Sequence, residues 1–585
     1  MVDEPITIIE IDLDFCDLTF GTSPCTAALS GSVPKKCFNT FYTCKDQQNY
    51  SKGSLTYRFI EPTSSYPKTG TVFPCLKSVS GSSAMANIAG ADSKLYGLGK
   101  RATVTATFSD FPYGDKFMDN YQSERISGAA QFSAVGYIPK EYGTFWSKLK
   151  ARNPNYAGRP MRKITGVIRD GALIIEKTRH FIITEIKGPG TNGIVTIEGK
   201  DILKLADDDR ALAPSPSRGK ISADIADSGT PSFDLLPSGI GDEYPASGFA
   251  AVGSELMSYT RSGDTITITE RALSGTQISS HSINDTFQDS FSIRNQQIHV
   301  TIRDLLRDYA GVDPSFIPFS DWADEVGIWA PSLVLTADIM KPEGVSKLIG
   351  ELAVLGVTIW WDEVAQEIKL KINAPVDLQS IVSLTDRNNI IAASEEDRAE
   401  DRLTEVLFNT VQIDPSKGVN EDNFLRGDLF VSTLEKTDNA FGDTKVKTIN
   451  CRWVNHGDYA SIRILALRLL ARFKLAPWRY VIDVDYRDDL GIADVVSLNS
   501  YIATDDTGEL QPQLAQVIMR EDKVEGSTVT LRLQKFQFDQ RYGYITENTR
   551  PLYTASIDAQ KDRGAYFVNG TTLLFGDGTG PYLFI

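Results

Sequence analysis

The chain has 585 residues, a net charge of −16 and a pI near 4.9. This acidic balance excludes a generic nucleic-acid-binding surface, which needs clustered Lys and Arg, and it disfavours an anionic membrane surface. The length predicts about three to five domains, and a hydrophobic content of 41% is typical of a folded protein. We expect no membrane anchor, because no apolar run reaches about eighteen residues.

Four cysteines lie close together near the N-terminus, in the pattern C-x8-C-x11-C-x6-C: Cys16, Cys25, Cys37 and Cys44. Only Cys75 and Cys451 follow. Four thiols in so short a stretch suggest a metal site with four sulfur ligands, either zinc or an iron–sulfur cluster. Structural zinc is usually held by closely spaced pairs such as C-x2-C, which are absent here. Long gaps bring each sulfur in on its own loop, which favours a [4Fe-4S] cube.

Zinc, disulfides and inert thiols remain as alternatives at this stage. The disulfide alternative is weakened by the start of the chain, MVDEPITIIEID, which has neither the basic nor the apolar region of a secretory signal. Cys75 and Cys451 lie in strand-like apolar segments, so we expect both to be small buried residues and not ligands.

The residues around the four cysteines resemble the cysteine-rich domain of minor tail proteins in long-tailed, lambda-like bacteriophages. The matching elements are Cys16, the stretch from Gly21 to Cys25, Cys37-Phe38-Asn39-Thr40, and Thr43-Cys44 before Asn49-Tyr50. The resemblance is specific over residues 1–60 and implies a [4Fe-4S] cluster held by the four cysteines in a tail-tip protein. The third gap is short compared with the family, so we expect a compact cluster loop.

Residues 162–201 are rich in β-branched residues and are broken by turn residues, as in an antiparallel meander. Asp170-Gly171 is typical of a hairpin turn. The segment DILKLADD that follows predicts a short helix. The run from Phe145-Trp146 through Arg162 to Asp201-Ile202-Leu203 resembles the first barrel of phage tail hub proteins, which prolongs the tail tube.

Residues 208–245 are rich in Pro, Ser, Gly and Asp, as linkers are. The following segment resembles an inserted β-module of phage tail proteins, with no chemistry attached. The resemblance rests on Tyr244-Pro245 before Gly248, on Glu255-Leu256-Met257, on Arg271 before Gly275-Thr276, and on His281. Ser262-Gly263-Asp264 predicts the turn between its two central strands.

Helical spacing of apolar residues predicts helices that start near Ile298 and Val345, which Gly311 and Gly356 would end, and residues 357–373 predict a hairpin. Such a module recurs in tail hub proteins, although any small α+β domain fits the pattern equally well. A long helix is predicted from Tyr459 to Phe473, ended by Pro477. Strands are predicted on both sides of it, with turns at Gly442-Asp443 and Glu525-Gly526.

The predicted fold class is mainly β with α+β modules: a multidomain chain of small β-barrels or meanders of the tail hub type and a loop-rich iron–sulfur domain. The expected domains are an iron–sulfur domain (1–95), a hub β-barrel (96–207), a linker with an inserted β-module (208–290), an α+β hub module (291–375), a β-rich hub domain with one long helix (376–545) and a C-terminal extension (546–585).

No catalytic constellation is evident in the sequence. The four histidines, His180, His281, His299 and His456, have no metal-ligand spacing, and neither G-x-S-x-G nor a P-loop occurs. We therefore expect no enzyme and no catalytic residue.

The resemblance implies a structural protein of the virion tail, a siphovirus tail-tip or baseplate hub, assembled in the bacterial cytoplasm as a homotrimeric ring. The expected partners are its own copies, distal tail and tube proteins, the tape measure protein and the central tail fibre. DNA would pass through the lumen without specific binding. The alternative function is a soluble iron–sulfur redox protein with β accessory domains.

Overall fold

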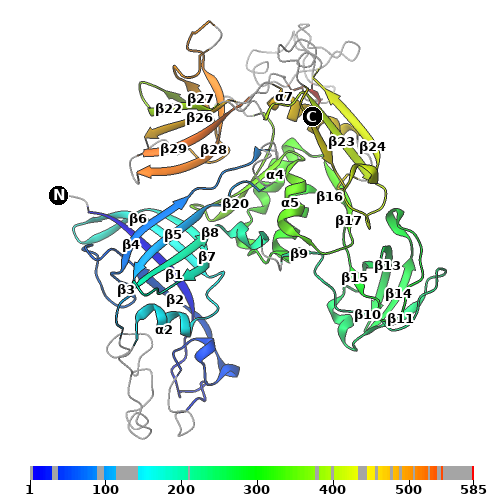
Figure 1. The fold of residues 1–585 in the computed structure, drawn as a ribbon, viewed down its shortest axis with the longest axis horizontal. Helices are drawn as coiled ribbons and strands as arrows, with labels where there is room; N and C mark the ends of the chain where they lie inside the picture. The colour runs from blue at the N-terminus through cyan, green and yellow to red at the C-terminus, as the bar shows by residue number, and fades with distance from the viewer. Residues whose placement is uncertain are drawn as a thin grey trace, which may run out of the picture. The chain divides into compact units, whose positions relative to one another are not determined.

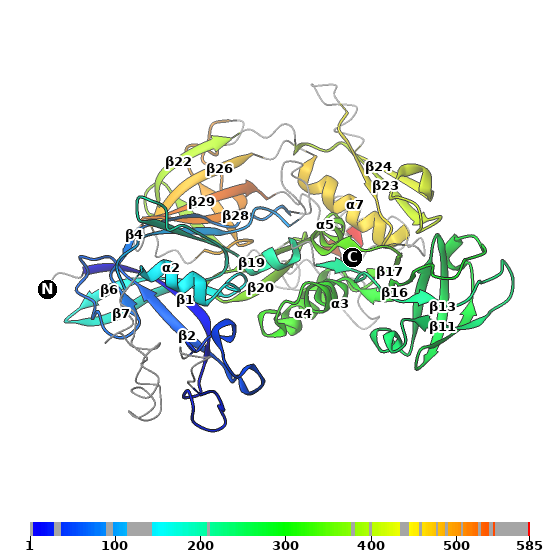
Figure 2. The ribbon, with the colours of Figure 1, turned by 60° about the horizontal axis from the view of Figure 1, so that its bottom comes forward.

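A computed structural model shows a multidomain, mainly β protein (Figures 1 and 2). The structure describes residues 4–28, 37–88, 98–113, 143–207, 211–375, 381–396, 401–432, 444–454, 459–474, 478–485, 490–504, 507–524, 528–536, 542–543 and 583–584. The chain forms two compact units. The first comprises Met1–Ala84, Arg101–Lys204 and Trp361–Glu367, and the second comprises Met85–Lys100, Leu205–Trp360 and Ile368–Ile585.

The first unit is built on one eight-stranded sheet in the order β3-β2-β1-β6-β7-β8-β5-β4. Its strands are β1 (Glu4–Cys16), β2 (Lys52–Phe59), β3 (Val72–Phe73), β4 (Leu76–Ser82), β5 (Thr103–Ser109), β6 (Pro160–Arg169), β7 (Ala172–Lys187) and β8 (Ile194–Lys200). The edge strands β3 and β4 are separated by only Pro74 and Cys75, so the sheet must curl until its edges lie close together. Helix α2 (Phe145–Arg152) belongs to the same unit and buries Phe145 and Trp146.

Alternation along β1 explains how this sheet has two different faces. Ile9, Ile11 and Leu13 are buried on the inner face, against aromatic rings that include Phe59 and Trp146, whose ring centroids lie 4.9 Å apart. Successive side chains of a strand point to opposite faces, so Glu10 and Asp12 lie on the outer face. There they pair with Arg162, which faces Glu10 from β6 in the sheet register.

The predicted meander is confirmed, because β6, β7 and β8 are consecutive neighbours and Asp170-Gly171 forms the turn, both residues with positive φ. The short helix is present as a 3-10 helix, Ile202–Asp207. The domain boundary expected between residues 95 and 96 is wrong, since β1 to β4 and β5 to β8 form a single sheet. The meander supplies only part of that sheet, and the strands before residue 95 complete it.

The second unit contains a six-stranded antiparallel module in the order β10-β11-β14-β13-β12-β15. Its strands are β10 (Lys220–Ile221), β11 (Ser232–Leu236), β12 (Ser247–Val252), β13 (Glu255–Ser262), β14 (Thr265–Glu270) and β15 (Phe287–Asp289). Gly263-Asp264 forms the turn that the sequence predicts. The module has its own apolar core, in which Met257, Ile266 and Phe287 are fully buried.

An α+β region follows the module along the chain. Its elements are β16 (Phe291–Gln297), α3 (Ile298–Asp304), which continues as one π-helical turn (Leu305–Tyr309), α4 (Phe319–Trp329), β17 (Val334–Ile339), β18 (Glu343–Gly344), α5 (Val345–Ala353), β19 (Val357–Asp362) and β20 (Glu367–Ile372); β18 pairs with β9 (Leu212–Ala213). Both predicted helices and the hairpin are confirmed, and Gly311 and Gly356 have the positive φ of helix stops. The sequence analysis missed α4, β16 and β17.

The C-terminal half of the second unit holds two further sheets. One has the order β21-β27-β28-β29-β26-β22 and the other the order β24-β23-β25. Their strands are β21 (Val382–Thr385), β22 (Ile390–Glu396), β23 (Glu405–Gln412), β24 (Phe424–Val431), β25 (Val446–Asn450), β26 (Arg479–Asp485), β27 (Val495–Asn499), β28 (Gln513–Val524) and β29 (Thr528–Lys535). A short pair, β30 (Tyr542–Gly543) and β31 (Leu583–Phe584), ends the described chain.

The predicted long helix is confirmed as α7 (Tyr459–Phe473). The prediction of strands joined around residues 442–443 needs correction, because β24 and β25 do not pair with each other. Both pair with β23, which the sequence analysis missed, β24 antiparallel and β25 parallel. The predicted turns at 442–443 and 525–526, Pro477, His456 and nearly all of the C-terminal extension lie outside the described residues. Among the helices that are described, none is long and apolar enough to cross a membrane.

Candidate metal centre

The four N-terminal cysteines all belong to the first unit, and all four are free thiols. Cys16 is the last residue of β1, so one ligand candidate is fixed directly to the sheet. Cys25 follows a turn in which its N–H donates to the Thr22 carbonyl. Cys44 directly follows a 3-10 turn, Phe41–Thr43. Cys16 and Cys37 are buried, and Cys25 and Cys44 are half-buried.

Asn39 ties the segment after Cys37 to the segment after Cys16. The Cys16 N–H donates to the Asn39 carbonyl at 2.6 Å, and the Asn39 side-chain amide donates to the carbonyls of Cys16 (3.1 Å) and Leu18 (3.2 Å). Asn39 adopts a φ of +58°, a left-handed conformation that asparagine tolerates better than most residues. The asparagine of the Cys-Phe-Asn-Thr stretch is therefore a scaffold residue that positions two cysteine segments.

The two threonines of the motif have the same kind of role. Thr40 donates its hydroxyl to the Arg152 carbonyl at the end of α2 (2.7 Å), which anchors the loop to the sheet domain. Thr43 accepts from the Phe38 N–H (3.0 Å), which closes the loop between Cys37 and Cys44. The expected compact third loop agrees with this short, internally bonded turn.

Asp46 is a scaffold residue that the sequence analysis missed. Its carboxylate accepts from the Thr26 N–H (2.7 Å) and hydroxyl (2.9 Å), and also from the Asn49 side chain (3.0 Å). Because Thr26 follows Cys25 and Asp46 lies two residues after Cys44, this carboxylate joins the Cys25 and Cys44 segments. The Asp46 N–H also points to the Cys44 sulfur at 3.4 Å. The Asp-x-x-Asn spacing after Cys44 was the available sequence signal.

The sulfur atoms of three cysteines lie within electrostatic reach of one another. Burial raises the pKa of the Cys44 thiol, and the neighbouring thiols of Cys16 and Cys25 raise it further, against the Asp46 N–H that lowers it. Tyr50 lies in the same environment: burial, then Asp14, Cys16 and Cys44, raise its pKa to about 12. Its hydroxyl oxygen is buried and has no hydrogen-bond partner among the described residues.

Four thiols are the donor set that a thiolate-bound cluster needs. A buried hydroxyl without a partner, such as that of Tyr50, is a place where an additional hydrogen-bond acceptor is expected. Within the described ranges, no group of three or more His, Cys, Asp or Glu side chains is placed to hold a metal ion.

The two remaining cysteines are packed in apolar surroundings, as expected. Cys75 and Cys451 are 3% and 2% exposed, and burial raises the pKa of each thiol to about 12.

The residues singled out in the inserted β-module form a buried clasp. Glu255 is fully buried, and its carboxylate accepts two hydrogen bonds from Arg271 (2.7 and 2.9 Å). It also accepts from the N–H groups of Ser279 and Ala272 and lies 2.8 Å from the His281 ring nitrogen. Burial opposes ionisation, but the bonds from Arg271 and then His281 lower the pKa of Glu255 overall. Tyr244 donates to the Phe287 carbonyl and accepts from the Gly219 N–H, which joins the ends of the module.

The other described histidines have structural surroundings. His299 is buried against Phe319, and its pKa is lowered by burial. His180 is half-buried on β7, where burial and then Arg162 lower its pKa. Its backbone N–H donates to the Glu363 carbonyl, and its carbonyl accepts from the Trp361 indole N–H. The structure brings no two of His180, His281 and His299 into a common site.

Comparisons with known proteins gave no matching family model and no matching curated protein. Among solved structures, the chain is similar to a tail protein from Neisseria meningitidis (12% identity, 78% of this chain and 97% of that chain, TM-score 0.34). It is also similar to a 43 kDa tail protein of prophage MuSo2 from Shewanella oneidensis (9% identity, 78% and 97%, TM-score 0.33) and to a Francisella PdpA-VgrG complex (9% identity, 91% and 58%, TM-score 0.32). Similarity at this level establishes neither a family nor a function.

Proposed function

We propose that this chain is a structural component of a bacteriophage tail tip or baseplate, a hub protein whose N-terminal loops are cross-linked by a [4Fe-4S] cluster. The observation that carries the proposal is the scaffold around the four cysteines. The non-cysteine residues of the tail-protein motif, Asn39, Thr40 and Thr43, make the hydrogen bonds that hold the cysteine segments together. Polar motif residues that hold cysteine segments in place are consistent with a metal-binding role.

Cys16, Cys25, Cys37 and Cys44 would be the four ligands. When bound, the cluster supplies a covalent cross-link between loops that are far apart in the sequence. Asn39 and Asp46 orient the ligand segments, and the Asp46 N–H donates toward the Cys44 sulfur. The Tyr50 hydroxyl has no hydrogen-bond partner among the described residues and interacts electrostatically with Cys16 and Cys44. The loops bury little apolar surface of their own, so a structural role for the cluster is favoured over electron transfer.

The remainder of the chain supports a structural role in the virion. Several β-modules leave sheet edges that assembly can cover, as in a homotrimeric ring that continues or closes the tail tube. The net charge of −16 suits a lumen through which DNA passes without being retained. The partners would then be copies of this chain, distal tail and tube proteins, the tape measure protein and the central fibre.

Mass and metal analysis of the anaerobically purified chain tests both halves of this proposal. We expect a homotrimer with four irons per chain, present at a few copies in purified virions. A monomer or dimer that is absent from virions and has a readily titrated cluster would instead support the redox alternative. One zinc per chain, in a colourless protein, would leave the hub function standing but replace the cluster.

A further inference from the structure

Strand β25 is an open edge of the three-stranded sheet. The Cys451 N–H donates to the Asn409 carbonyl and the Glu405 N–H to the Lys445 carbonyl, so the odd-numbered residues of this segment bond to β23. The backbone groups of the residues between them, Val446, Thr448 and Asn450, therefore point away from β23. Among the described strands none pairs with that side.

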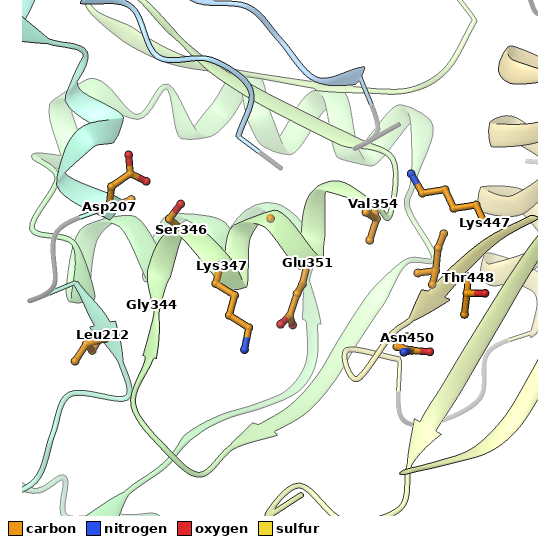
Figure 3. A pocket seen from close by; sticks show the side chains of 13 residues that line it. Asp207, Leu212, Gly344, Ser346, Lys347, Glu351, Val354, Lys447, Thr448 and Asn450 are labelled. Atoms are coloured by element: carbon orange, nitrogen blue, oxygen red, sulfur yellow. The ribbon is translucent and has the colours of Figure 1, made fainter. Parts of the chain in front are cut away.

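The open edge borders a cavity of about 780 Å³ between β25 and helix α5. Figure 3 shows Thr448 and Asn450 on the strand side and Lys347, Glu351 and Val354 on the helix side. The two walls are tied together by Arg452, which lies two residues after the end of β25 and pairs with Glu343 (2.7 Å) and Glu351 (2.8 Å). The cavity thus lies beside backbone groups with which no described strand pairs.

Charge complementarity indicates what occupies the cavity. Lys347 pairs with Glu343, and Glu351 pairs with Arg452. The two other charged residues of the lining, Asp207 and Lys447, also interact within the chain. An added charge would lose hydration without gaining a counter-ion. The cavity edge therefore favours an extended segment without unpaired charge, which backbone hydrogen bonds recognise.

The opposite edge of the same sheet presents such a segment, because the charged side chains of β24, Arg426 and Asp428, pair with each other (2.6 Å). The Ser432 N–H donates to the Thr404 carbonyl, and this antiparallel register directs the backbone of Leu425, Gly427 and Leu429 away from β23. Leu425 and Leu429 are 76% and 53% exposed, unusually high for leucines in a strand. The inner face of β24 is covered by α7, where Phe430 stacks on Tyr459. Figure 2 shows β23 and β24 beside α7.

We propose that β24 of a second copy of this chain adds to β25, so that the sheet continues from copy to copy. The contact joins two different edges and is head-to-tail, and head-to-tail contacts close into rings when the rotation allows. This inference rests on the proposed hub ring and assigns its subunit contact. It also accounts for a strongly acidic chain assembling with itself, because neither edge contributes an unpaired charge.

Engineered disulfides test the strand contact. In one copy, Thr448 and Leu429 both lie opposite Leu407, on either side of it, so they are about 9.6 Å apart, beyond the roughly 7 Å limit for a disulfide. A disulfide between these positions must therefore join two copies. We would combine Thr448→Cys with Leu429→Cys, and separately with Leu425→Cys to sample the register. The matched control combines Thr448→Cys with Ile391→Cys, because Ile391 is 63% exposed on β22 of another sheet.

We expect oxidation to give a covalent trimer on denaturing gels for at least one test pair, and none for the control pair or the single variants. Thr448→Pro removes an N–H outside the ladder, and should convert the trimer to monomer while leaving the monomer folded. A wild-type trimer that neither cross-links nor responds to Thr448→Pro would overturn the strand contact alone. A wild-type monomer absent from virions would overturn both the contact and the hub function.

Discussion

The cysteine loops and the inserted β-module show two ways to order a segment rich in turns. The module buries its own apolar core, and its motif residues form a complete clasp in which Glu255 meets Arg271 and His281. In the described parts of the cysteine loops few apolar residues are buried, and Phe20 is the largest of them. The Tyr50 hydroxyl has no hydrogen-bond partner there. From this comparison we expect the module to be ordered by the chain alone, whereas the proposed cluster would add a cross-link to the loops.

The largest expected effect is on the loops. Each of Cys16→Ser, Cys25→Ser, Cys37→Ser and Cys44→Ser should abolish the cluster and make residues 17–50 sensitive to protease, because the cross-link is lost. Cys451→Ser is the control: it should retain all iron and lower the free energy of unfolding by about 1–3 kcal/mol, since a hydroxyl replaces a buried thiol. If Cys451→Ser loses iron while a loop variant retains it, the ligand set is wrong.

The clasp should have the next largest effect. Glu255→Gln leaves the Arg271 guanidinium buried without its counter-ion, and should lower the free energy of unfolding of the module by about 3–5 kcal/mol. Glu243→Gln removes an exposed partner of Arg218 in the same module and should leave the free energy of unfolding nearly unchanged, because solvent screens this pair. Denaturant unfolding of the full chain, followed by protection of module peptides from hydrogen exchange, measures both. Equal effects of the two variants would contradict the clasp.

The pH dependence of the same module has a sign that can be checked. Burial raises the pKa of Asp289 to about 6, so the folded module holds a proton that the unfolded chain releases near pH 4. The stability this proton provides is therefore lost as the pH rises from about 4 to 6. Asp289→Asn should stabilise the module by about 1–3 kcal/mol at pH 7.5 and have little effect at pH 4. The opposite trend would mean that Asp289 is ionised and well solvated in the folded module.

Much of this contrast was visible in the sequence, because it depends on local patterns. The meander turn at Asp170-Gly171, helix α7 and the four cysteines were found from spacing and turn chemistry. Pairings between distant strands were not visible in the sequence. Strand β23 lies between β24 and β25, and its residues Leu407 and Asn409 have partners in both strands, which no local pattern reveals. Burial of Arg468 and Arg472 on α7 was missed for the same reason, since tertiary packing makes a charged face internal.

For the candidate metal centre, the sequence predicted the cysteine ligands but not the residues that hold them in place. The cysteine types and spacing identify the sulfurs, but the role of Asp46 depends on its meeting Thr26 across the loops. Asn39→Ala should therefore retain the cysteines but loosen the Cys16 segment, with a loss of about 1–3 kcal/mol for its buried hydrogen bonds. Faster loss of the cluster in the presence of a chelator would measure this loosening. Asn49→Ala, whose side chain bonds only at the exposed rim to Asp46, is the milder control.

The smallest expected effect is that of Tyr50→Phe, which should differ between protein with the cluster and protein without it. In cluster-free protein, Tyr50→Phe removes a buried hydroxyl that has no partner, and should leave stability unchanged or raise it by about 1 kcal/mol. In loaded protein the same change removes a donor beside Cys16 and Cys44, and should shift the cluster's absorption or EPR signal. An identical response in both forms would mean that the hydroxyl does not face the cluster.

Quantifying iron, acid-labile sulfide and zinc in the anaerobically purified full chain tests the central claim most directly. The account predicts close to four irons and four sulfides per chain, a brown colour, and loss of both in Cys37→Ser. One zinc per chain, or a metal-free protein with the four cysteines in disulfides, would contradict it.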